Sequence, residues 1–191
     1  MNFLAHLYLS GDDPDIQLGN FLGDFVRGRN WSARFPENIA AGIAMHRRID
    51  EITDAHPVVR LSKMRLRPAH RHYSGVIVDI FYDHFLAVAW SEHHQLPLTE
   101  FAHQFYRHAT ERKNLLPERA AWVLEHMMKG DWITGYQSLE GIHRVLCGMA
   151  RRTNFASGME VASDALKAGY ADFENEFSTF FPELKKACLM S

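Results

Sequence analysis

The sequence predicts an all-α bundle. No segment shows the alternation of apolar and polar residues, bounded by hairpin turns, that indicates a strand. Near the C-terminus, apolar residues recur in alternating steps of four and three, as on one face of a helix: Leu166, Tyr170, Phe173, Phe177, Phe180 and Leu184. A chain of 191 residues, 47% of them hydrophobic, can fill one core, so we expect residues 1–191 to form a single domain.

Five helices are expected in the N-terminal half. The first covers Asn2 to Leu9, and the second runs from about Asp15 toward Arg27. Pro36 suits the first turn of the third helix, which continues to Asp54, because proline presets the helical φ angle. A shorter helix follows Pro57, and a central one spans Arg71 to His93.

The C-terminal half continues in the same way. Pro97 introduces a helix through Arg112, with Thr99 as a residue able to cap its free N–H groups. The next helix starts at Pro117 and ends near Gly130, and another covers Thr134 to Arg151. The apolar stripe predicts a long final helix.

Composition excludes several classes of protein. A net charge of −2 disfavours a general nucleic-acid binder. No apolar run approaches the roughly 20 residues of a membrane-spanning helix, and the first residues lack the basic leader of a signal peptide. Cys147 and Cys188 are read as packing residues in a reducing compartment, so we expect a cytoplasmic protein with no membrane insertion.

Two acidic residues interrupt the apolar central helix. Asp79 and Asp83 lie one turn apart, between residues that are otherwise apolar. An unpaired buried charge costs several kcal/mol. We therefore expect each carboxylate to meet a cation, accept strong hydrogen bonds or hold a raised pKa.

The third helix carries a polar continuation of its apolar stripe. His46 and Asp50 follow Ile43 at the same angular position, and Asp54 follows one turn later. Side chains four residues apart converge on one side of a helix, which suits the ligands of a metal ion. The residues alone leave a second interpretation open, in which Arg47 and Arg48 pair with these acids in a structural network.

Two further candidates precede this helix. On spacing alone His6 is a core histidine, and Asp24 is unremarkable. Gly19 and Gly23, however, are costly inside a helix and permit the close approach of a neighbour or ligand.

The available ligands indicate a class of chemistry. The nucleophile-elbow, P-loop, dinucleotide-binding, HExxH and CxxC motifs are all missing. Oxygen and imidazole ligands without thiolates favour Mn²⁺, Mg²⁺ or Fe²⁺. Such an ion acidifies a bound water and neutralises phosphoryl charge, so the residues indicate a possible metal-dependent phosphohydrolase.

A basic segment runs from Arg60 to His72 and contains no acidic residue. Its cations are Arg60, Lys63, Arg65, Arg67 and Arg71. Both a solvated helix face and a docking surface for an anionic partner fit this pattern.

The chain resembles the bacterial acyl carrier protein phosphodiesterases. The blocks that carry the resemblance are Met1–Leu7, Gly19–Gly28, Gly42–Asp50, Thr53–Asp54 and Asp83–Leu86. The resemblance implies a manganese-dependent enzyme with an HD-like fold and a metal site between helices. It would cleave the phosphodiester between 4′-phosphopantetheine and a serine of holo-acyl carrier protein (holo-ACP), giving apo-ACP.

The resemblance also implies roles for individual residues. The metal ligands are expected among His6, Asp24, His46, Asp50 and Asp83. Asp79 and His84 are expected to orient other groups or transfer protons, and Arg47 to hold the phosphate. Acyl carrier proteins are acidic, so the basic segment is expected to dock them. Mn²⁺ is the expected ion, with Mg²⁺ or Fe²⁺ as alternatives.

Two other functions remain as alternatives. An HD-like phosphohydrolase of a nucleotide or another small phosphodiester would use the same metal site with a different pocket. A non-enzymatic helical adaptor would bind an acidic protein through the basic segment, and would neither bind a metal nor be stabilised by one.

Overall fold

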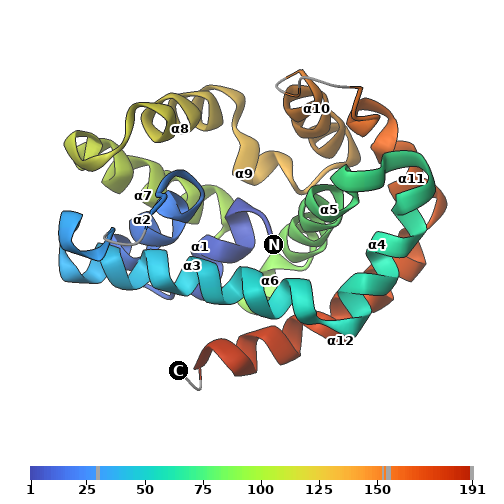
Figure 1. Cartoon of the computed structure of the whole chain (residues 1–191), viewed down its shortest axis with the longest axis horizontal. Coiled ribbons are helices and arrows are strands. Elements are labelled where there is room, and N and C mark those ends of the chain that lie inside the picture. Colours follow the sequence, from blue (N-terminus) through green and yellow to red (C-terminus); the bar gives the residue numbers. More distant parts are fainter. Residues whose placement is uncertain (29–30, 152, 154–155, 190–191) are drawn as a thin grey trace.

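The computed structural model describes residues 1–28, 31–151, 153 and 156–189. Helices make up most of this part of the chain, and it contains no strand, which confirms the all-α class. The α-helices, labelled in Figure 1, are α1 (Phe3–Leu9), α2 (Pro14–Leu22), α3 (Glu37–Ala55), α4 (Pro57–His70), α5 (Ser74–Val88), α6 (Trp90–His93), α7 (Leu98–Glu111), α8 (Glu118–Gly130), α9 (Trp132–Gly135), α10 (Leu139–Ala150), α11 (Ala162–Ala168) and α12 (Tyr170–Leu189).

Proline and polar residues set several helix starts. Pro14 and Pro57 occupy the first turns of α2 and α4, and Asp13 accepts hydrogen bonds from two free N–H groups of α2. Helix α7 differs from the expectation: it begins directly after Pro97, without a side-chain cap, so Thr99 lies inside its first turn.

Some expected helices are shorter or divided. The second helix ends at Leu22 and tightens into a 3₁₀ turn, η1 (Gly23–Phe25), which carries Asp24. The expected Thr134–Arg151 helix is two helices, because Ser138 caps a new start by accepting a hydrogen bond from the N–H of Gly141. The expected central helix likewise divides at Ala89 into α5 and α6.

Helices α2 and α3 cross at two glycines. A Cβ atom added to Gly19 would lie 2.0 Å from the carbonyl oxygen of Ile39, and one added to Gly42 would lie 2.2 Å from that of Ile16. No side chain fits at such distances, so glycine at both positions allows the two backbones to touch. This contact fixes η1, which follows α2, against α3.

The centre of the molecule is α5, with α1 and the N-terminus beside it and α4 and α12 along its other side (Figure 1). The apolar stripe of the last two helices packs into the core, as expected: Leu166, Phe173, Phe177, Phe180 and Leu184 are buried, and Tyr170 packs against them partly buried. Gly169 divides this stripe between α11 and α12. None of the helices described is both long and apolar enough to cross a membrane.

Candidate functional site

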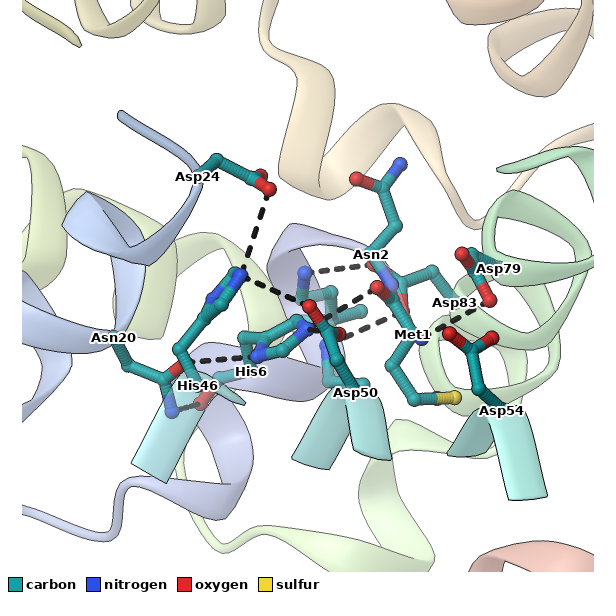
Figure 2. Close-up of polar contacts among 12 residues, drawn as sticks. Met1, Asn2, His6, Asn20, Asp24, His46, Asp50, Asp54, Asp79 and Asp83 are labelled. Atoms are coloured by element: carbon teal, nitrogen blue, oxygen red, sulfur yellow. Dashed lines mark hydrogen bonds and ion pairs between the residues drawn. The ribbon is translucent and has the colours of Figure 1, made fainter. Parts of the chain in front are cut away.

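Two histidines and an aspartate from α1 and α3 meet at the surface of the core. The Nε2 atom of His6 lies 3.2 Å from one carboxylate oxygen of Asp50, and Nε2 of His46 lies 3.2 Å from the other. One nitrogen or oxygen from each of the three residues lies within 4.8 Å of those from the other two (Figure 2). The three side chains can therefore supply ligands to one ion. We call them the triad.

Asp24 of η1 extends the triad on one side. Its Oδ1 atom lies 3.5 Å from Nε2 of His46, the same nitrogen that faces Asp50. Asp24 and Asp50 are about half exposed, whereas both histidines are buried. The polar end of the cluster thus opens toward solvent and its imidazole rings close it from the core.

Asn20 of α2 fixes the orientation of His6. The Asn20 side chain donates from Nδ2 to the His6 carbonyl and to Ser10, each at 2.9 Å, so its oxygen faces Nδ1 of His6 at 2.8 Å. Nδ1 therefore donates to Asn20, and a neutral His6 has its lone pair on Nε2. Histidines that bind metals commonly donate their second ring N–H in this way.

His46 is held by packing instead. Its Nδ1 atom is buried and has no hydrogen-bond partner among the residues described. Its ring stacks on that of His6, with centroids 4.1 Å apart and an interplanar angle of 22°. On another side the ring touches Gly23, where an added Cβ would lie 2.1 Å from Cγ of His46. The glycines singled out in the sequence therefore do admit close neighbours.

Burial and charge shift the protonation of these groups. Burial alone would lower the pKa of His46, but Asp24 and Asp50 raise it to about 9. Burial opposes the ionised form of Asp50, yet the two histidines hold its pKa well below the usual value. Burial lowers the pKa of His6, which is consistent with a neutral imidazole. The triad is thus a closely coupled acid–imidazole cluster.

A pocket of about 170 Å³ opens over these groups. Its lining is largely polar and comes from Met1, Asn2, Asp24, His46, Asp50, Thr53, Asp54 and Asp79. Asp24 stands at one side of it, and Asp54 and Asp79 stand at the other (Figure 2). We call this space the triad pocket. Asp79 forms an ion pair with the amino group of Met1, at 3.0 Å, so this carboxylate meets a cation, as expected.

Asp83 has a different environment from the triad. Its two oxygens accept hydrogen bonds from the backbone N–H groups of Asn2, Leu4 and Ala5 at 3.2, 2.7 and 3.3 Å. The residue is fully buried, and burial raises its pKa to about 7. Asp83 therefore caps the start of α1, and the structure does not bring it into the triad.

His84 and Arg47 also point elsewhere. His84 is buried, with Nδ1 2.7 Å from the carbonyl oxygen of Tyr136 and Nε2 3.0 Å from the Tyr170 hydroxyl. Arg47 donates to the carbonyl oxygen of Val26 at 3.2 Å and lies 4.7 Å from the ring centroid of Trp31. Arg47 thus holds the segment that follows η1.

The basic segment forms α4 and the turn after it, and its cations differ in their contacts. Arg65 pairs with Asp172 and Glu176 of α12, at 2.9 and 3.1 Å. Lys63 pairs with Asp54, at 2.6 Å, on the rim of the triad pocket. The other three, Arg60, Arg67 and Arg71, are exposed and form no ion pair with any residue described.

Sequence reasoning missed Asn20 and the first residue. Asn20 is fully buried, and the only signal for it was a polar amide beside Asp24 in an otherwise apolar stretch. The backbone of Met1 has no signal in a side-chain pattern, yet its carbonyl oxygen lies 3.2 Å from Nε2 of His6. The Asn20 side chain and the Met1 carbonyl oxygen reach the triad only through tertiary folding.

Comparisons with known proteins add independent information. A family model described as acyl carrier protein phosphodiesterase matches residues 1–184. The chain is 34% identical to the acyl carrier protein phosphodiesterase of Photorhabdus laumondii, over 95% of this chain and 92% of the relative. It is 35% identical to the enzymes of that name from Enterobacter sp. strain 638 and Escherichia coli O157:H7, over 96% of this chain and 95% of each relative. No solved structure gives a significant match.

Proposed function

This chain belongs to the acyl carrier protein phosphodiesterase family, and from that membership we propose its reaction. The enzyme hydrolyses the phosphodiester between 4′-phosphopantetheine and a serine of holo-ACP. Its products are apo-ACP and 4′-phosphopantetheine.

The triad is the observation that carries this proposal at the level of the site. His6, His46 and Asp50 converge within 4.8 Å, and His46 and Asp50 line an open polar pocket together with Asp24. A ligand set of imidazole nitrogens and carboxylate oxygens, without thiolate, suits Mn²⁺, Mg²⁺ or Fe²⁺. The hydrogen bond from His6 to Asn20 supports the same use, since it directs the Nε2 lone pair toward Asp50.

We propose Mn²⁺ as the ion, held by the triad and by Asp24. A divalent cation at this position would supply Lewis-acid stabilisation of phosphoryl charge and would acidify a water molecule. Asp83 is left out of the proposed ligand set, because three backbone N–H groups already occupy its oxygens.

The remaining groups have supporting roles in this proposal. Asp79 and Asp54 line the side of the triad pocket opposite Asp24, where a carboxylate could accept a proton. Arg47 acts as a positioning residue, because its contacts to Val26 and Trp31 hold the segment after Asp24. His84, bonded to Tyr136 and Tyr170, stabilises the packing between α5 and those residues.

The protein substrate is proposed to dock on one face of α4. Arg60 and Arg67 lie at helical spacing around Met64, which is 63% exposed, and Arg71 follows at the C-cap of α4, where the backbone leaves the helix. We call these four residues the α4 surface. Exposed guanidinium groups around an exposed apolar side chain suit an acidic protein partner. Lys63, which pairs with Asp54, connects this helix to the rim of the triad pocket.

A direct assay tests the reaction. Purified protein is incubated with holo-ACP in Mn²⁺ or in chelator, and the mass of the carrier protein is followed. We expect loss of the prosthetic group in Mn²⁺ alone. Because the proposed ligands act together on one ion, His46→Ala and Asp50→Ala should each reduce the rate by at least about a hundredfold.

The matched control is His103→Ala, which changes an exposed histidine of α7. It should keep the wild-type rate. Activity that survives chelation, or a fully active Asp50→Ala protein, would contradict the metal centre. If the mass of holo-ACP never changes but the protein hydrolyses small phosphodiesters, the result would instead favour a small-molecule phosphohydrolase.

A further inference from the structure

A second pocket lies next to the triad pocket, beside Asp24. It has a volume of about 220 Å³, and Asn2 and Asp24 line both spaces. The rest of its wall comes from Phe3 of α1, from Phe25, Arg27 and Tyr136, and from α8, α9 and α10, and none of these lining residues belongs to the triad. A ligand with its phosphate at the triad can therefore continue into this second space.

The wall of the second pocket is mixed in character. Its apolar residues include Phe25, which follows Asp24 in the chain, and Val123, Val145 and Met149 from α8 and α10. The charged residues on its wall are Asp24, Arg27 and Arg119, and both arginines are exposed. The pocket thus combines an apolar floor with two cationic groups at its open edge.

We propose that this pocket binds the pantetheine arm of the substrate, beginning with its pantoyl end. This inference rests on the proposed function. In the arm, a carbon bearing two methyl groups is separated from the phosphate ester by one methylene, and amide groups follow. The apolar residues of the pocket, which include Phe25 next to Asp24 in the chain, suit the two methyl groups, and guanidinium groups at the edge are suited to the amide carbonyl oxygens.

The size of the pocket limits what it holds. Pockets that enclose whole drug-sized ligands measure roughly 300–1,000 Å³, whereas this one measures about 220 Å³. It therefore takes the pantoyl part, and the thiol end of the arm extends toward the surface.

The position of the pocket also orients the phosphodiester. The arm leaves the triad on the side of Asp24, while Asp54 and Asp79 stand on the other side (Figure 2). Lys63 of α4 pairs with Asp54 on that other side. The serine of the carrier protein is thus directed toward α4, opposite the arm, and the two halves of the substrate bind to different surfaces.

Binding of pantetheine, which lacks phosphate and protein, tests this pocket separately from catalysis. Mn²⁺-loaded protein is titrated with pantetheine by calorimetry, comparing wild type with Met149→Trp, which fills the pocket. We expect wild type to bind and the variant to bind at least about tenfold more weakly, since loss of a buried apolar contact is worth about 1.4 kcal/mol. The KM for holo-ACP should rise in parallel.

Two further variants keep the test decisive. Met128→Trp makes the same substitution at an exposed methionine of α8 outside the pocket, and should keep wild-type affinity. Arg119→Ala alters the exposed edge without disturbing the core, and should weaken pantetheine binding about threefold even if Met149→Trp fails to fold.

The outcomes separate this inference from the proposed function. We call the second pocket the arm pocket. Equal pantetheine affinity in wild type, Met149→Trp and Arg119→Ala, or no binding to wild type, would contradict the binding of the arm in this pocket while leaving prosthetic-group release intact. Wild-type protein that binds pantetheine but never releases the group from holo-ACP would instead overturn the proposed function.

Discussion

Asp79 and Asp83 show how two carboxylates with the same spacing acquire different roles. They lie one turn apart on α5, yet Asp79 contacts the Met1 amino group beside the triad pocket and Asp83 is enclosed by the first turn of α1. The difference comes from depth, since Asp79 is a quarter exposed and Asp83 is fully buried. At the residue scale, the partner of each side chain decides its chemistry.

Gly23 should control the position of His46. In Gly23→Ala the new Cβ would overlap the imidazole ring, at 2.1 Å from Cγ. No hydrogen bond to Nδ1 of His46 from the residues described opposes a shift of the ring. We expect kcat/KM to fall by about tenfold to a hundredfold, because a 1 Å displacement of a catalytic group can cost about that much. Steady-state kinetics and Mn²⁺ titration measure the effect.

Gly148→Ala is the matched control for this substitution. An added Cβ at Gly148 of α10 meets nothing within 4 Å. It should leave activity unchanged and stabilise the protein by roughly 0.5–1 kcal/mol, as alanine does in a helix. A fully active Gly23→Ala protein would show that the site tolerates a displaced imidazole.

The protonation of His46 predicts opposite pH trends with and without metal. Without metal, its pKa is about 9 in the folded protein, against an ordinary value of 6.5 in the unfolded chain. Folded protein holds the proton more tightly, so this stabilisation is complete below pH 6.5 and disappears as pH rises through 9. We expect a loss of about 1–2 kcal/mol, reduced from the full shift because Asp24 and Asp50 are half exposed.

The Mn²⁺ contribution should change in the other direction. An ion must displace the proton from His46, so the gain in stability on adding Mn²⁺ should grow between pH 6.5 and 9. Chemical denaturation at several pH values, with Mn²⁺ and with chelator, measures both trends, and His46→Gln should flatten both. A gain from Mn²⁺ that does not vary with pH would argue against His46 as a ligand.

At the scale of helices, local chemistry explains what the sequence could predict. The starts of α3, α7 and α8 follow prolines that are visible in the chain, α4 begins at Pro57, and most of the apolar stripe of α12 is buried as expected. The divisions within expected helices depend on neighbours instead. Phe173, for example, packs against Gly169, where α11 gives way to α12. The HD-like subdivision of the fold stays a prediction.

The site was predictable to a similar degree and for a similar reason. Spacing on α3 identified His46 and Asp50, because both lie on one helix face. Spacing could not assign Asp83, because its hydrogen-bond partners lie 78 to 81 residues away in the chain. Periodicity gives the direction of a side chain from its own helix, whereas the partner is set by tertiary packing.

Substitution of Asp83 should reduce the stability of the protein more than it reduces the affinity for Mn²⁺. Asp83→Ala leaves three N–H groups at the start of α1 without their acceptor, so we expect a loss of roughly 2–4 kcal/mol in the free energy of unfolding. Asp83→Asn keeps one acceptor oxygen and should lose less. Urea denaturation measures both variants. If Asp83 is a cap, folded Asp83→Asn protein should bind Mn²⁺ within about threefold of wild type, a difference below 1 kcal/mol; a large loss of affinity would return it to the ligand set.

At the scale of the whole molecule, the α4 surface and the arm pocket lie toward different sides of the triad. Lys63 joins α4 to Asp54 on one side, and Asn2 and Asp24 join the arm pocket on the other. A protein substrate with a long flexible arm needs such an arrangement, because the carrier protein is too large to enter a pocket of about 170 Å³. Docking strength and chemistry should therefore be separable by mutation.

Reversing charge on the α4 surface should weaken docking without changing the chemical step. Arg60 and Arg67 are suited to this test because they are exposed and free of ion pairs in the part of the chain described, whereas Arg65 also holds α12 through Asp172 and Glu176. In Arg60→Glu/Arg67→Glu we expect KM for holo-ACP to rise about tenfold at low salt with kcat nearly unchanged. The difference from wild type should shrink as salt approaches about 1 M, where the Debye length falls to about 3 Å.

Arg107→Glu, at an exposed arginine of α7, controls for net charge. An equal rise in KM per reversed charge in that control would assign the effect to overall charge, and an unchanged KM in the double variant would move the docking surface away from α4.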